Sequence, residues 1–255
     1  GTFGGLPVDL GLPYTYEIVD NTVTITDCDT STSGALVIPA TIEGKPVTSI
    51  GESAFENCQR LTSITIPDGV TSIGNSAFRS CTDLTSITIP DGVTSIRYAA
   101  FYKCTNLISV TIPDSVTSIG NYAFRSCTSL TNITIGDSVT SIGDNAFNSC
   151  TSLTSITFLG NAPSLGSNAF MNISAVAIIY IEPTASGFGE MFGGLPVSSV
   201  RLYTYEIVGD AVAITDCDKT ESGALVIPAT IEGKPVTSIG KEAFENCTGL
   251  TSIRI

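Results

Sequence analysis

The most constraining feature of the chain is a repeat of 23 residues, marked by cysteines that recur at that spacing. The cysteines are Cys58, Cys81, Cys104, Cys127 and Cys150, and the residues between them repeat as well. A unit this short cannot bury an apolar face by itself, so successive units must stack on one another to share a core. The sequence therefore predicts a solenoid, whose function is expected to lie on its surfaces.

One unit, from Leu61 to Asp83, reads L-T-S-I-T-I-P-D-G-V-T-S-I-G-N-S-A-F-R-S-C-T-D. Ile64 and Ile66 alternate with polar residues, which is the period of two expected for a strand with one buried face. A second short extended piece should follow the proline. Ala77 and Cys81 lie four residues apart, so we expect one helical or 3-10 turn that points both side chains inward.

The pattern L-x-x-I-x-I-P…V-x-x-I-x-x-x-A-F-x-x-C resembles the BspA-like leucine-rich repeats of bacterial and some protozoan surface proteins. The resemblance covers Leu36 to Ile173 and again Leu225 to Ile255. It implies an all-β-rich leucine-rich-repeat solenoid. It also implies an extracellular or cell-surface protein that adheres to host or matrix proteins or glycans.

A longer repeat of 189 residues is superimposed on the first. The stretch G-A-L-V-I-P-A-T-I-E-G-K-P-V-T-S-I-G stands at Gly34 to Gly51 and, unchanged, at Gly223 to Gly240. We therefore interpret the chain as part of a tandem array. Its expected parts are the tail of a preceding module (residues 1–13), one complete module (14–197) and the start of the next (203–255).

Within the complete module, we expect a β-hairpin cap at residues 14–28, where apolar and polar residues alternate on both sides of Asp20-Asn21. The coils should occupy residues 34–173. A closing strand and tail should follow at 175–197, because Ala175 to Ile181 is a continuous apolar run that is typical of a buried strand. Caps of this kind shield the end coils of a solenoid.

The composition indicates an exported protein. With 24 acidic and 11 basic residues the formal net charge is −13, which repels the phosphates of DNA and RNA and excludes nucleic acid as a partner. No apolar run approaches the roughly 18 residues of a membrane-spanning helix, so we expect no membrane insertion of this segment. Charged residues are only 14% of the chain, so Ser, Thr, Asn and Gly must supply most of its polar surface.

The repeat cysteines fall at an inward position, where a small apolar side chain packs well in a stack. We therefore expect Cys58 to Cys150 to be buried free thiols. The state of Cys28 and Cys217, one in each predicted hairpin cap, stays open. No cofactor or metal is expected, because the chain has no histidine and no two cysteines lie closer than 23 residues.

Catalysis is not expected either. Without histidine there is no Ser-His-Asp or Cys-His arrangement, and the commonest general acid and base is missing. A pair of carboxylates is the remaining alternative, since aspartate recurs at Asp68, Asp91, Asp114 and Asp137. Each of them follows the end of a predicted strand, where aspartate forms turns.

The outer face of the first strand in each coil is the main candidate binding surface. Stacking should align two polar ladders there: Ser63, Ser86, Ser109, Asn132 and Ser155, and beside them Thr65, Thr88, Thr111, Thr134 and Thr157. Two interpretations stay open. Polar residues are what any solvated strand face requires, or the ladders bind glycans or peptide backbone through many weak contacts. A minor alternative is binding to ice or another crystal surface.

Two coils depart from the repeat. Arg97 and Tyr98 replace the usual Gly-Asn, Tyr102 and Lys103 follow soon after, and Tyr122 stands in the next coil. Aromatic and basic groups gathered on an acidic solenoid favour contact with a partner. Drift at neutral surface positions is the alternative. We therefore expect a non-enzymatic adhesion module, and the competing hypothesis is a self-assembling structural repeat of a stalk, sheath or filament.

Overall fold

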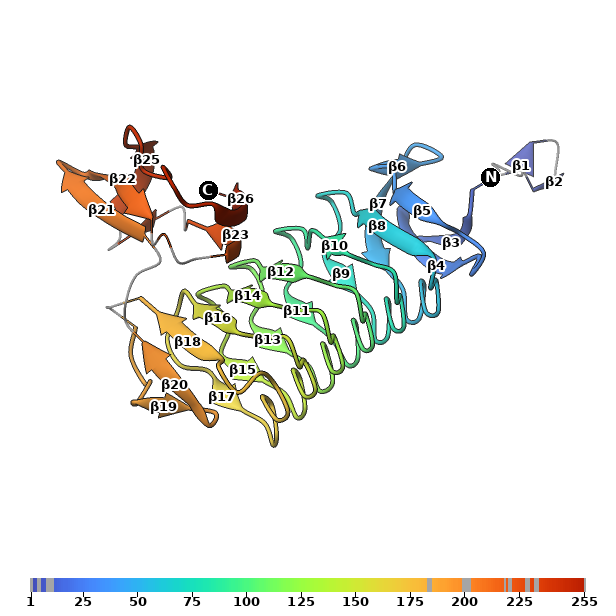
Figure 1. The fold of residues 1–255 in the computed structure, drawn as a ribbon. Coiled ribbons are helices and arrows are strands. Elements are labelled where there is room, and N and C mark those ends of the chain that lie inside the picture. The colour runs from blue at the N-terminus through green and yellow to red at the C-terminus, as the bar shows by residue number, and fades with distance from the viewer. Residues whose placement is uncertain are drawn as a thin grey trace.

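The computed structural model describes strands β1 (Thr2–Phe3) and β2 (Leu6–Pro7) and residues 12–182, 185–198, 203–217, 219, 222–227, 230–231 and 234–254. The coils stack into an elongated all-β solenoid (Figure 1). This confirms the predicted fold class. The described residues include no helix, and so none that is long and apolar enough to cross a membrane.

Each coil contributes one strand to each of two sheets. The first sheet has the order β19-β20-β18-β16-β14-β12-β10-β8-β5, and its strands are parallel except at β19 and β20. They are β5 (Gly34–Val37), β8 (Leu61–Thr65), β10 (Ser86–Ile87), β12 (Ser109–Ile112), β14 (Asn132–Ile135), β16 (Ser155–Phe158), β18 (Ile178–Ile181), β19 (Met191–Phe192) and β20 (Leu195–Ser198).

The second sheet has the order β17-β15-β13-β11-β9-β7-β4-β3, with β6 (Thr41–Ile42) paired to β7. Only the hairpin at its end and the β6 pairing are antiparallel. Its strands are β3 (Tyr14–Val19), β4 (Thr22–Cys28), β7 (Lys45–Ile50), β9 (Ser72–Ile73), β11 (Ser95–Ile96), β13 (Ser118–Ile119), β15 (Ser141–Ile142) and β17 (Ser164–Leu165).

The core is a set of columns, each formed by the residues that hold the same place in successive coils. One column is a stack of phenylalanine rings whose centroids lie 5.1 to 5.4 Å apart: Phe55, Phe78, Phe101, Phe124, Phe147 and Phe170. Parallel stacking follows from the repeat, because each coil presents the same ring at the same height.

A second column contains the cysteines, and the prediction of buried free thiols at Cys58 to Cys150 is confirmed. The Cys81 thiol donates a hydrogen bond to the carbonyl oxygen of Phe55, at 3.0 Å, and Cys104, Cys127 and Cys150 repeat this contact one coil further along. Burial raises the pKa of Cys81 to about 12 and raises that of Cys104 well above its usual value. Cys81 and Cys104 are therefore protonated packing groups.

The predicted helical turn is instead a series of hydrogen-bonded turns. Within the coil, the Arg79 N–H donates to the carbonyl oxygen of Ser76. The alternate N–H groups point along the solenoid, so that Phe78 donates to Ala100 of the next coil at 2.8 Å. Ser76 and Ser80 have left-handed φ values of 54° and 58°. This alternation breaks the helix and gives its hydrogen bonds to the neighbouring coil.

Close approach of the coils reserves one column for glycine. A Cβ atom built on Gly74 would lie 2.5 Å from the backbone nitrogen of Glu52 and 2.6 Å from the carbonyl carbon of Gly51. Backbone atoms cannot rotate out of the way, so a side chain here would push the coils apart. The column reads Gly51, Gly74, Arg97, Gly120, Gly143 and Gly166.

Hairpins lie at both ends of the stack. β3 and β4 pair around Asp20 and Asn21, whose positive φ values of 49° and 63° suit a tight two-residue hairpin turn. At the other end, the expected closing strand forms only over Ile178–Ile181, and Val176 is 71% exposed. β18 does not close the sheet, because the hairpin of β19 and β20 pairs beyond it.

The start of the next module repeats these elements. β21 (Tyr203–Val208), β22 (Ala211–Cys217), β25 (Lys234–Ile239) and β24 (Thr230–Ile231) form one sheet, and β23 (Ser222–Val226) pairs with β26 (Gly249–Arg254). A disulfide joins Cys217 to Cys247. β23 lies beside β12 and β14 of the first sheet (Figure 1). The Tyr203 hydroxyl donates to Glu182 at 3.0 Å, which links the two modules.

Candidate partner-binding surfaces

The two polar ladders predicted on the first sheet are in register. Parallel pairing sets Ser63 beside Ser86, Ser86 beside Ser109, and Ser109 beside Asn132. The threonine ladder is aligned in the same way from Thr111 onward. Apart from Asn132, no ladder side chain hydrogen-bonds to another residue of the described chain. Their hydroxyls are therefore available to solvent or a ligand.

Exposure along the ladders is uneven. Thr65, Ser86 and Thr88 are exposed, but Thr134 is only 8% exposed. The remaining ladder residues are half-buried: Ser63, Ser109, Thr111, Asn132, Ser155 and Thr157. Because β23 lies beside β12 and β14, the ladders offer their most open surface at the coils nearer the N-terminus.

The residues that depart from the repeat gather on a different surface, formed by the turns that follow the second sheet. The Tyr98 and Tyr122 rings meet edge to face with centroids 5.7 Å apart, and Tyr98 is 51% exposed. The Arg125 guanidinium lies 5.5 Å from the centroid of the Tyr122 ring. We call this group the turn-face cluster and define it as Arg79, Arg97, Tyr98, Tyr102, Lys103, Tyr122 and Arg125.

A second aromatic ring in the cluster, that of Tyr102, has two cations near it. The Arg79 guanidinium lies 5.4 Å and the Lys103 ammonium 5.3 Å from the centroid of the Tyr102 ring. Lys103 also donates its backbone N–H to the Arg125 carbonyl at 2.9 Å, so that adjacent coils hold the cations together. The result is a continuous surface of tyrosine rings and positive charge.

The cluster is a positive region on an acidic chain. All four basic residues between positions 61 and 200 belong to it. Arg79 approaches Glu56 at 3.6 Å, but within the described part of the chain Arg97, Lys103 and Arg125 form no ion pair. The Arg125 Nε is buried without a hydrogen-bond partner. Three cations are thus left to attract an anion.

Residues 45–192 and 224–255 match the family model described as the BspA type leucine rich repeat region, in six copies. The chain belongs to this family. It is similar to the leucine-rich repeat protein of T. pallidum, with 30% identity and a TM-score of 0.52 over 63% of this chain and 86% of that one. No curated protein sequence matches the chain.

The chain is also similar in fold to two other solved bacterial structures. A leucine-rich cell surface protein from Faecalibacterium prausnitzii A2-165 is 29% identical, with a TM-score of 0.54 over 98% of this chain and 76% of that one. The pneumococcal vaccine antigen PcpA is 19% identical, with a TM-score of 0.52 over 95% of this chain and 68% of that one. The last likeness concerns the fold alone.

Against this BspA-type repeat, one residue of the turn-face cluster occupies an unfavourable position. Arg97 stands in the column that is otherwise glycine, and the β9–β11 pairing beside it is reduced to one residue pair, Ile96 with Ile73. Lys103 and Tyr122 both have a φ of 60°, a value shared by the residues at the same places in other coils, such as Ser80 at 58° and Asn145 at 53°. The unfavourable residue is therefore Arg97, which carries a Cβ where the close approach of the coils favours glycine, and this argues against drift at that position.

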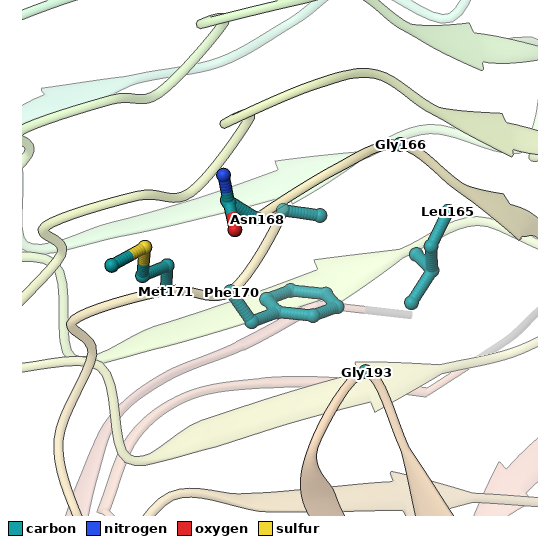
Figure 2. Close-up of a pocket in the computed structure, with 7 residues that line it drawn as sticks. Leu165, Gly166, Asn168, Phe170, Met171 and Gly193 are labelled. Carbon is teal, nitrogen blue, oxygen red and sulfur yellow. The ribbon is translucent and has the colours of Figure 1, made fainter.

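A cavity of about 340 Å³ lies at the C-terminal end of the phenylalanine stack. Figure 2 shows residues that line it. Phe170 and Leu165 line it, and Gly193 closes it from the hairpin of β19 and β20. Its other lining residues are Gly166, Asn168, Ala169 and Met171. None of these side chains ionises or acts as a nucleophile, so the cavity cannot supply acid–base chemistry.

The recurring aspartates are turn residues, as expected from their place after the strands. The Asp137 N–H is bound by the carboxylate of Asp114 from the preceding coil at 3.1 Å, and the Ser138 hydroxyl donates to Asp137 at 2.9 Å. The carboxylates are thus used to hold successive turns together.

Several side-chain hydrogen bonds between coils cannot be predicted from the sequence of a single repeat. The Thr85 hydroxyl donates to the Thr62 carbonyl at 3.1 Å, and Thr117 donates to Thr94 at 3.2 Å. These threonines look like those of the predicted ladders, and only the direction of the side chain separates them. The glycine column, by contrast, is visible in the sequence, where Arg97 interrupts it.

Proposed function

We propose that the chain is a non-enzymatic, extracellular or cell-surface adhesion module that binds its partner through the turn-face cluster. The observation that carries the proposal is the gathering of tyrosine rings and cations on one surface, with Arg97 in a column that close packing otherwise reserves for glycine. A residue that strains the fold where it stands is expected at functional sites. The cell-surface F. prausnitzii relative supports the location.

The chemistry of the cluster favours an anionic polysaccharide as the partner. Guanidinium groups bind carboxylate and sulfate through charge-assisted hydrogen bonds. Tyrosine rings present a negative π face and an apolar surface to the C–H groups of a sugar ring. The cluster spans several successive coils, so an extended chain with repeated charges would meet several cations at once.

The test is retention of the purified chain on immobilised sulfated polysaccharide, polyuronate and neutral dextran. A reversion variant replaces cluster residues with those found in neighbouring coils: Arg97→Gly, Tyr98→Asn, Lys103→Ser and Tyr122→Asn. The matched control is Ser86→Ala with Thr88→Ala on the first sheet. We expect the original chain and the control to bind the two anionic polymers in a salt-sensitive way, and the reversion variant to lose binding.

Equal binding by the reversion variant, or loss of binding in the ladder control alone, would overturn the assignment to the cluster. Equal retention on polyglutamate would show that negative charge is recognised without the sugar. Binding to neutral dextran would assign recognition to the tyrosine rings or to the hydroxyl ladders.

A second candidate function is a structural array of self-docking modules. The specific observation in its favour is the position of β23 beside β12 and β14, together with the Tyr203–Glu182 hydrogen bond at the module junction. Light scattering at rising concentration, with negative-stain imaging, tests it. Ordered polymers would support the array, and a monomer at all concentrations would refute self-assembly of this chain.

A further inference from the structure

Cys28 and Cys58 occupy the same places in the complete module as Cys217 and Cys247 in the next one. Cys28 ends β4 as Cys217 ends β22, and both are preceded by the same Ile-Thr-Asp. The sequence separation is 30 in both pairs. The sequence between them includes the identical stretch at Gly34 to Gly51. Both pairs therefore close loops of the same length that begin at the end of the hairpin and contain the same 18-residue stretch.

In the next module this pair is a disulfide, with 6.5 Å between the Cα atoms of Cys217 and Cys247. That separation lies in the range that a disulfide spans without movement of the backbone. In the complete module Cys28 and Cys58 are buried free thiols. Between the partners the two segments differ at only a few positions, among them Thr32, which accepts a hydrogen bond from the Cys28 thiol at 3.5 Å and corresponds to Glu221 in the next module.

Cys58 also differs from the other cysteines of its column. Those from Cys81 onward donate to a phenylalanine carbonyl of the preceding coil. Cys58 is the first residue of this column, and its sulfur lies 3.9 Å from the carbonyl oxygen of Cys28. The Cys28 thiol lies 3.6 Å from the carbonyl oxygen of Asp29 and 3.5 Å from the Thr32 hydroxyl. Its interaction with Cys58 lowers the pKa of Cys28 to about 7 and raises the pKa of Cys58. Cys58 therefore lies against Cys28 and does not make the phenylalanine contact of the later cysteines.

We propose that Cys28 and Cys58 form a disulfide that fastens the β3–β4 hairpin to the first coil. The same crosslink, repeated in each module, would secure the cap that shields the end of each stack. The four thiols from Cys81 to Cys150 stay reduced in this scheme. The inference is independent of the proposed binding function.

The oxidant is a small-molecule disulfide such as glutathione disulfide, and the chemistry is thiol–disulfide exchange. The Cys28 thiolate attacks one sulfur of the oxidant, breaks its S–S bond and releases one thiolate. Cys58, after loss of its proton, attacks the Cys28 sulfur of the mixed disulfide and releases the second thiolate. The two cysteines lose two protons and two electrons, and the oxidant becomes two thiols. Since Cys28 is only 4% exposed, the exchange requires the hairpin to be detached from the coil.

The experiment folds the purified chain in a glutathione and glutathione disulfide buffer and alkylates it with iodoacetamide in denaturant. Peptide mapping without reduction then locates the crosslinks. We expect a Cys28–Cys58 peptide beside the Cys217–Cys247 peptide, loss of labelling at these four positions, and full labelling at Cys81, Cys104, Cys127 and Cys150.

Two variants make the result specific. Cys28→Ser should restore labelling of Cys58, whereas Cys81→Ser should leave the Cys28–Cys58 crosslink unchanged. Full labelling of Cys28 and Cys58 in a sample where Cys217 and Cys247 are crosslinked would overturn the proposal. A crosslink between Cys58 and Cys81, or between Cys127 and Cys150, in place of the proposed one would also overturn it.

Discussion

Replacing Gly74 by alanine should weaken the solenoid far more than an ordinary surface change. The added Cβ would lie 2.5 Å from the Glu52 nitrogen and 2.6 Å from the Gly51 carbonyl carbon, both of them backbone atoms. The collision can be relieved only by separating two coils, which strains the hydrogen bonds between them. Overpacking of this kind typically costs about 1–3 kcal/mol of unfolding free energy, and we expect Gly74→Ala to fall in that range.

The reciprocal change, Arg97→Gly, should stabilise the chain or leave it unchanged. Removing the Cβ from the glycine column allows the coils to close, and the gain is offset by about 0.5–1 kcal/mol for the greater freedom of glycine in the unfolded chain. The matched control is Gly69→Ala, whose Cβ would meet only the Val47 carbonyl oxygen at 3.3 Å. It should change stability by less than about 1 kcal/mol.

Urea unfolding followed by circular dichroism suits the three variants, because the chain has no tryptophan. The midpoint should fall clearly for Gly74→Ala and should not fall for Arg97→Gly. If Gly74→Ala were no more harmful than Gly69→Ala, the column would not be reserved for glycine. The argument that Arg97 is kept at the expense of stability would then fail.

Three further variants probe the core and the crosslink. Phe101→Ala should lower the unfolding free energy by about 3–5 kcal/mol. Phe170→Ala should lower it by less, since Phe101 stacks on two rings and Phe170 on one. Equal losses of stability in urea unfolding would show that ring stacking adds nothing. The pKa of Cys81 is raised from 9.0 to about 12, so folding favours the protonated thiol and the stability of the chain should decline as pH rises between these values. The stability of the Cys81→Ala variant should decline less over the same range. Identical profiles of stability against pH would contradict the assignment. Cys217→Ser removes a crosslink with a sequence separation of 30 and should destabilise the next module by about 3–4 kcal/mol under oxidising conditions, with no difference in the presence of a reductant.

The solenoid could be predicted from the sequence because its determinants are local and repeated. The alternation at Ile64 and Ile66 specifies which side of a strand is buried, and all coils carry the same pattern. The hairpin at Asp20-Asn21 forms because these residues tolerate a positive φ.

The turn after the second strand was predicted incorrectly because its hydrogen bonds are not local. Spacing within one unit places Ala77 and Cys81 on one side, which a helical turn also does. The Phe78 N–H, however, donates to the next coil, and this alternative exists only in the stack. The apolar run at Ala175 to Ile181 predicts a closing strand, but β20 pairs beyond it. This pairing also depends on a segment outside the run.

The candidate sites were likewise predictable from the sequence only in part. Register alone aligns the polar ladders, so residue number was enough to predict them. The Tyr98–Tyr122 contact joins two coils at unequal repeat positions, and Lys103 meets the Tyr102 ring from a left-handed residue. The tyrosines, Arg97 and Lys103 were identified from the sequence. Arg79 and Arg125 required the structure to be placed with them.

Titration calorimetry of a sulfated polysaccharide into the original chain, the reversion variant and the ladder control tests the central claim most directly. If the turn-face cluster is the binding surface, the reversion variant should bind at least about tenfold more weakly, which corresponds to about 1.4 kcal/mol, while remaining at least as stable as the original. The ladder control should bind with unchanged affinity. A reversion variant that keeps the original affinity would contradict the account.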